Sequence, residues 1–157
     1  MSDDGAATMI MNSMFGGTST SKLFLNVREK LSLCYYAGSS YHRKKGLITV
    51  SSGIEPKNYQ RALDEIMTQL EALRRGEWED WELEGARSSL RNALRSMEDS
   101  ASALEDFTMG QMATGSDETI PGLLSAVEAV TPERVRQAAE QVRPDTIYFL
   151  KGKEAEE

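Results

Sequence analysis

Histidine and cysteine are nearly absent from this sequence. Its 157 residues hold one histidine, His42, and one cysteine, Cys34. A lone cysteine excludes an internal disulfide, suits a reducing compartment and leaves no thiolate cluster for a structural zinc. A lone histidine cannot supply the histidine pair of an H-x-x-E-H or H-E-x-x-H metal motif. The stretch from Cys34 to His42, if extended, spans about 26 Å, which is too far for a catalytic Cys–His pair.

Long apolar runs and nucleotide-binding glycine motifs are also missing. No apolar run approaches the roughly 18 residues that a membrane span needs. The N-terminal stretch MSDDGAATMIMNSMF lacks the basic start of a signal peptide. Neither G-x-x-x-x-G-K-[ST] nor G-x-G-x-x-G occurs. We therefore expect a cytoplasmic protein that does not enter a membrane and has no phosphate-binding loop.

Basic residues are outnumbered, with 18 Lys and Arg against 25 Asp and Glu and a formal net charge of −7. A net acidic chain is poorly suited to nucleic acid, which requires clustered cations. The only dense basic run, His42 to Lys45, ends at Gly46 between two predicted strands. We interpret it as a solvated hairpin turn, because no aromatic residues are interleaved with the basic ones.

The residues that are present predict an α+β fold with a small, mostly antiparallel sheet and helices packed on one face. Two strands, 34–42 and 47–54, should form a hairpin across the basic turn. A third strand is expected at 145–151 (DTIYFLK). Because the chain opens on an apolar helix, we expect that an earlier strand of the sheet is missing.

The predicted helices account for most of the remaining chain. One covers Met9–Phe15 and ends at Gly16-Gly17, and the next has Leu23, Val27 and Leu31 on one face. The others are a helix from Pro56 to Gly76, one long helix at 80–114 with an apolar stripe reaching Met112, a short helix at 123–130, and a helix that starts at Thr131-Pro132. We expect one domain over residues 1–157, with 152–157 as a mobile acidic tail.

One segment resembles a known signature. Residues 16–36 read GGTSTSKLFLNVREKLSLCYY. This is similar to the "GG…SRLF…LREK.GLAY" pattern of the M16 (pitrilysin/insulinase, mitochondrial-processing-peptidase-like) zinc metallopeptidases. The order of elements from Met9 to Leu150 also resembles an M16/LuxS-like half. Ser32 and Cys34 depart from the pattern, where the family usually has Gly and a small residue.

The resemblance implies a role for two residues. In such peptidases two homologous halves face each other across a chamber, and the first half binds zinc through H-x-x-E-H and a distal Glu. The second half lacks the metal ligands and contributes an arginine and, seven residues later, a tyrosine to the substrate. Arg28 and Tyr35 fall on these positions. The implied function is a C-terminal, non-catalytic domain that completes the chamber of a bacterial zinc metalloendopeptidase.

That reading has implications for cofactors and partners. This chain would bind no metal and would be inactive alone. Zinc would reside in an H-x-x-E-H half, in the same parent chain or in a separate subunit, and the substrate would be a peptide. The isolated chain is expected to self-associate through the surface it normally buries.

Alternatives remain open at this point. Arg28 is equally consistent with a helix-surface residue paired with Glu29 or Glu105, and Tyr35 or Tyr36 with a half-buried sheet face. A shift of one residue in strand register would exchange the faces of the two tyrosines. The parent could instead be a scaffold that has lost zinc in both halves, or the chain an unrelated α+β binding module.

Overall fold

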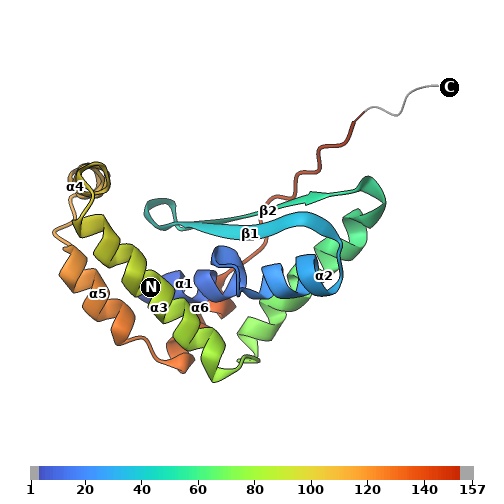
Figure 1. Cartoon of the computed structure of the whole chain (residues 1–157), viewed down its shortest axis with the longest axis horizontal. Helices are drawn as coiled ribbons and strands as arrows, with labels where there is room; N and C mark the ends of the chain where they lie inside the picture. The colour runs from blue at the N-terminus through green and yellow to red at the C-terminus, as the bar shows by residue number, and fades with distance from the viewer. Residues whose placement is uncertain (1–3, 153–157) are drawn as a thin grey trace.

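The first helix runs through the centre of the computed structural model, which describes residues 4–152 (Figure 1). Helix α1 spans Gly5–Asn12, and the Asp4 carboxylate caps it by accepting a hydrogen bond from the Ala7 amide at 3.1 Å. It passes directly into the π-helical segment η1, Ser13–Gly17. The predicted helix at 9–15 therefore exists, but it starts earlier because Asp4 supplies the cap.

A hairpin forms the only sheet in the described residues. Strands β1 (Cys34–His42) and β2 (Leu47–Ile54) pair antiparallel, as the sequence predicts. The basic run makes the turn as one 3-10 segment, η3 (Arg43–Lys45), followed by Gly46 at φ 59°. That left-handed conformation favours glycine, which explains why the basic run ends there.

One face of the hairpin lies on the N-terminal helices (Figure 1). Ala37 and Ser39 of β1 are buried on this face, and the Ser39 hydroxyl donates to Asn12 Oδ1 at 2.7 Å. The opposite face carries exposed polar residues at Ser40, Thr49 and Ser51. Helices therefore cover one side of the sheet, which confirms the α+β prediction.

Helix α2 follows the hairpin and is bounded as its sequence predicts. Pro56 starts a 3-10 turn, η4 (Pro56–Asn58), which leads into α2, Tyr59–Arg74. Gly76, at φ 73°, ends the segment.

The predicted long helix at 80–114 is two helices. Helix α3 spans Asp80–Glu98 and α4 spans Ala101–Thr114. The Ser100 hydroxyl accepts a hydrogen bond from the Ala103 amide at 3.3 Å, so a new N-cap interrupts the helix. None of the α4 residues, all of which are described, is buried, and Met112 is 78% exposed. The prediction that the apolar stripe continues to Met112 is wrong.

Two short helices complete the helical layer. Helix α5 spans Ile120–Glu128 and α6 spans Pro132–Gln141. Thr119 and Thr131 cap them, each accepting a hydrogen bond from the amide three residues on. The start of α6 is confirmed, whereas α5 begins three residues before the predicted helix because Thr119 caps it.

The predicted third strand is not part of the sheet. Within residues 4–152 the sheet has two strands, and 145–151 belongs to neither a helix nor a strand. Phe149 of this segment stacks on Tyr59 at the start of α2, with ring centroids 4.4 Å apart. β-propensity alone does not create a strand, because a ladder needs a second backbone beside it. Residues 153–157 of the predicted mobile tail lie outside the described residues.

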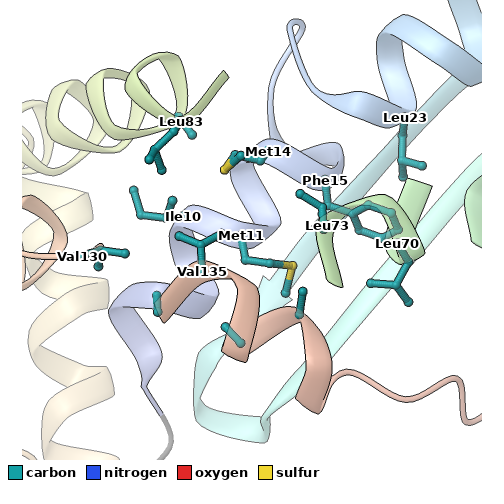
Figure 2. Packing of buried hydrophobic residues seen from close by; sticks show 14 of the residues in the cluster. Ile10, Met11, Met14, Phe15, Leu23, Leu70, Leu73, Leu83, Val130 and Val135 are labelled. Carbon is teal, nitrogen blue, oxygen red and sulfur yellow. The ribbon is translucent and has the colours of Figure 1, made fainter. Parts of the chain in front are cut away.

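The hydrophobic core gathers around α1. Ile10 and Met11 are fully buried, and Figure 2 shows them facing Val135 of α6, Leu73 of α2 and Leu83 of α3. This core fixes α1 and η1, and through them the segment that supports the hairpin.

Candidate functional site

Arg28 lies on a π-helical segment that is anchored to the helical layer. Segment η2 spans Leu23–Lys30, and both Leu23 and Val27 are fully buried. The buried Lys22 ammonium, just before η2, pairs with Glu82 of α3 at 3.0 Å. A π-helix has i→i+5 hydrogen bonds and more residues per turn than an α-helix, and such segments occur frequently at functional sites. Leu31, expected on the buried face, is 37% exposed, since the helix ends before it.

The chain reverses between η2 and β1 at Ser32. This residue has φ 49°, a left-handed conformation uncommon for residues other than glycine. The Ser32 amide donates to the Arg28 carbonyl at 3.1 Å and the Leu33 amide donates to the Val27 carbonyl at 3.1 Å. Leu33 is then buried, and β1 begins at Cys34. The helix thus ends near Ser32 and turns directly into the strand, which brings Arg28 next to Tyr35.

The reversal that brings Arg28 next to Tyr35 is called the corner below. The Arg28 guanidinium is held there by three contacts. Its Nε donates to the backbone carbonyl of Tyr35 at 3.1 Å, and its Nη1 lies 3.3 Å from the Glu29 carboxylate. The guanidinium carbon lies 4.6 Å from the centre of the Phe24 ring. The side chain is 40% exposed. It is therefore oriented by its neighbours yet reachable from solvent.

Tyr35 occupies a β-bulge. Cys34 pairs with Ile54 and Tyr36 pairs with Gly53, so Tyr35 is the extra residue on β1. As a result, the two consecutive tyrosines are both exposed, Tyr35 to 73% and Tyr36 to 55%. The Tyr36 ring lies over Gly53, where a Cβ atom would come within 2.5 Å of it. The bulge removes the strict alternation that would bury one of the tyrosines.

Two neighbours of this corner did not emerge as site residues from the sequence. Phe24 lies four residues before Arg28, and this spacing, which places them on one helix face, is the signal that could have identified it. Lys57, whose pKa is raised mainly by its hydrogen bond to Glu55, also lies within electrostatic range of Tyr35. No local pattern connects Lys57 to Tyr35, since they lie on different elements.

The described residues were compared with two other kinds of site, a metal centre and a membrane span, and they also contain a cavity away from Arg28 and Tyr35. Within residues 4–152, no group of three or more His, Cys, Asp or Glu side chains is arranged to hold a metal ion. No described helix is long and apolar enough to cross a membrane. A cavity of about 570 Å³ lies among α1, α3, α4 and the hairpin turn, lined by residues such as Leu94, Phe107 and Glu118. Neither Arg28 nor Tyr35 lines it, so it is separate from the corner.

Comparison with known proteins identifies the family. A family model described as "Peptidase M16 inactive domain" matches residues 2–90, which include η2, the hairpin and both exposed tyrosines. The chain belongs to the peptidase M16 family. The resemblance carried by residues 16–36 is thereby confirmed.

Relatives of this M16 chain are bacterial. It is 40% identical over 151 residues to "Probable inactive metalloprotease YmfF" of Bacillus subtilis (strain 168), covering 96% of this chain and 35% of that protein. "Uncharacterized zinc protease YmxG" of the same organism is 27% identical over 137 residues, covering 85% of this chain and 34% of the relative. The crystal structure of a conserved protein from Enterococcus faecalis V583 superposes with a TM-score of 0.79 at 35% identity, covering 86% of this chain and 32% of that one. The M16 chain thus spans about a third of the length of each of these three proteins.

Proposed function

We propose that this M16 chain is a C-terminal, non-catalytic domain that completes the substrate chamber of a zinc metallopeptidase, with Arg28 and Tyr35 contacting the peptide. The observation that supports this most is the corner itself: Arg28 is hydrogen-bonded to the backbone of Tyr35, and the Tyr35 side chain projects from a bulge with 73% of its surface exposed. An exposed aromatic at a bulge fits binding better than core packing.

The chemistry available at this corner suits a peptide backbone. Arg28 presents planar N–H donors, of which Nε is used by the Tyr35 carbonyl and Nη1 lies beside the Glu29 carboxylate, so the remaining N–H groups of the fork are left for peptide carbonyl oxygens. The Tyr35 hydroxyl donates a hydrogen bond to the scissile carbonyl oxygen as negative charge develops there, an interaction worth about 3 kcal/mol in the transition state. The proposal assigns zinc to the other half, and it is supported by the relative YmxG, which is named a zinc protease.

The wider setting is part of the proposal. The partner is an H-x-x-E-H half in the same parent chain or in a second subunit, the substrate is a peptide, and the complex works as a hydrolase in the bacterial cytoplasm. Coverage of only 35% of YmfF supports a longer protein or an assembly.

The test is peptidase turnover of this chain combined with the H-x-x-E-H half. Arg28→Ala and Tyr35→Phe should each lower turnover about 100-fold or more, as loss of one transition-state donor does. Each variant should melt within about 3 °C of the unaltered chain, because neither exposed side chain supports the core. Tyr36→Phe is the matched control and should retain turnover.

Two outcomes would contradict the proposal. One is a large fall in melting temperature with turnover per folded molecule preserved, which would make Arg28 and Tyr35 scaffolding. The other is cleavage of peptide by this chain alone.

A second candidate function is a scaffold in a pseudo-peptidase. It is favoured by the relative YmfF, whose name describes it as inactive and which is 40% identical. The sequences of the longer protein and of its neighbouring gene discriminate between the two functions. If neither contains an H-x-x-E-H motif, the scaffold function is favoured. In that case neither the unaltered chain nor Arg28→Ala shows turnover with the partner, and both still bind it.

A further inference from the structure

A groove of about 440 Å³ lies between α4 and the start of α5. Figure 1 shows α4 at one end of the molecule, beside the end of α3. Leu104 and Phe107 of α4 line the groove together with Ile120 and Pro121 of α5. Leu104 is 37% exposed, and α4, all of which is described, buries none of its residues. An apolar groove beside an uncovered helix is typical of a surface that binds a partner.

The groove carries charge of one sign. Of the described residues that line it, three are charged, and all three are acidic: Glu98, Asp117 and Glu118. Glu118 pairs with Arg43, whereas Glu98 and Asp117 are exposed and take part in none of the ion pairs formed within residues 4–152. The sequence at 96–133 contains eight Asp and Glu and neither Lys nor Arg. A ligand that carries positive charges beside apolar groups therefore complements this surface.

Helix α4 needs no cover in order to form. The Ser100 hydroxyl caps its start, and Gly115 ends it in the left-handed conformation at φ 65°. Obligate interfaces are more hydrophobic than this, since they resemble a domain core cut in half. A folded helix with an apolar groove and acidic residues around it therefore suits a partner that binds and leaves.

We propose that the groove between α4 and α5 binds a basic amphipathic helix of a separate partner protein. Its apolar side chains contact Leu104 and Phe107, and its Lys or Arg side chains pair with Glu98 and Asp117. Recognition of this kind uses one apolar helix face laid into a groove. A second copy of this chain is disfavoured as the occupant, because its net charge of −7 repels another acidic surface.

Fluorescence anisotropy of a labelled synthetic peptide tests the groove. The probe is a helix of about 18 residues, or five turns, with Leu on one face and Lys on the other. The controls are a scrambled peptide of the same composition and a peptide with Glu in place of every Lys. Near physiological salt the probe should bind about 10-fold or more tightly than either control. Equal binding of the scrambled peptide overturns the proposal, because charge alone then explains the attraction.

Substitutions locate the binding surface. Glu98→Lys and Leu104→Ser should each weaken probe binding about 10-fold or more. Glu98→Lys is compatible with folding, because a cation is favourable at the C-terminus of α3. Glu105→Lys is the matched control, since Glu105 is exposed on α4 but does not line the groove, and it should weaken binding less than about 3-fold. Equal losses for Glu98→Lys and Glu105→Lys overturn the assignment to the groove.

Two further results would assign the groove to another occupant and overturn the proposal. One is loss of probe binding in the longer protein that contains this chain, which would mean that the longer protein fills the groove itself. The other is a dimer that Leu104→Ser dissociates, measured by light scattering, which would make the occupant a second copy. No readout here depends on peptidase turnover, so failure of this proposal is distinguishable from failure of the proposed function.

Discussion

Ser32 decides how Arg28 meets Tyr35, because the reversal between η2 and β1 depends on its backbone. Its φ of 49° costs a residue with a Cβ about 1–2 kcal/mol, and most for a β-branched side chain. Ser32 already carries most of this cost, so Ser32→Val should lower the free energy of unfolding by the additional cost of β-branching alone, about 1 kcal/mol or less, measured by denaturant unfolding.

Ser32→Gly is the matched control for that substitution. Glycine adopts this conformation without steric cost, so the variant should be at least as stable as the unaltered chain. A glycine variant less stable than the valine variant would show that the Ser32 side chain, and not its backbone conformation, supports the reversal.

At the scale of elements, the contact between η1 and β1 determines how closely the hairpin packs on the N-terminal helices. A Cβ atom at Gly16 would lie 2.6 Å from the Ser39 amide nitrogen, which is backbone and cannot move aside cheaply. Gly16→Ala should therefore cost about 1–3 kcal/mol of stability by overpacking. Thermal or denaturant unfolding measures it.

Gly85 provides the opposite expectation within α3. A Cβ there meets no atom within 4 Å, and the position is helical and exposed. Gly85→Ala should stabilise the chain by about 0.5–1 kcal/mol through helix propensity. If Gly16→Ala stabilises the chain as Gly85→Ala does, close packing against β1 is not the reason why a glycine occupies position 16.

At the scale of the whole molecule, ion pairs join segments that are distant in sequence. Arg134 of α6 donates twice to the Asp4 carboxylate, with Nη2 to Oδ1 at 2.9 Å, and Arg43 at the hairpin turn pairs with Glu118 before α5. These hydrogen bonds lower the pKa of Asp4 below its ordinary 3.8 and that of Glu118 below its ordinary 4.5. Both carboxylates therefore hold fewer protons in the folded state than in the unfolded state.

This linkage predicts loss of stability in acid. The contribution of each pair is complete above the unfolded pKa values of 4.5 and 3.8, and it is lost as pH falls through the lower folded values. Unfolding free energy measured from pH 6 downward should decline below pH 4.5. Asp4→Asn keeps a capping side chain but removes the charge, so it should be less stable near neutral pH and decline less steeply. An unchanged slope would refute the contribution of Asp4.

Local chemistry allowed the sequence to predict the elements whose ends depend on nearby residues. The hairpin bounds follow from alternation and Gly46, and the start of α6 follows from Thr131 and Pro132. Arg28 and Tyr35 were nominated by a signature within one short stretch. Each of these signals needs only a few neighbouring residues, so the tertiary structure could not easily override it.

What only the tertiary structure decided rests on contacts between distant segments. The break at Ser100 and the exposure of α4 were not predictable, since a stripe of apolar residues does not reveal whether a surface lies opposite it. The bulge that exposes Tyr35 depends on the pairing of β1 with β2. The hydrogen bond from Arg28 to the Tyr35 carbonyl depends on the reversal at Ser32. Residues 145–151 have the composition of a strand, yet a strand forms only against a second backbone, which the described chain does not place beside them.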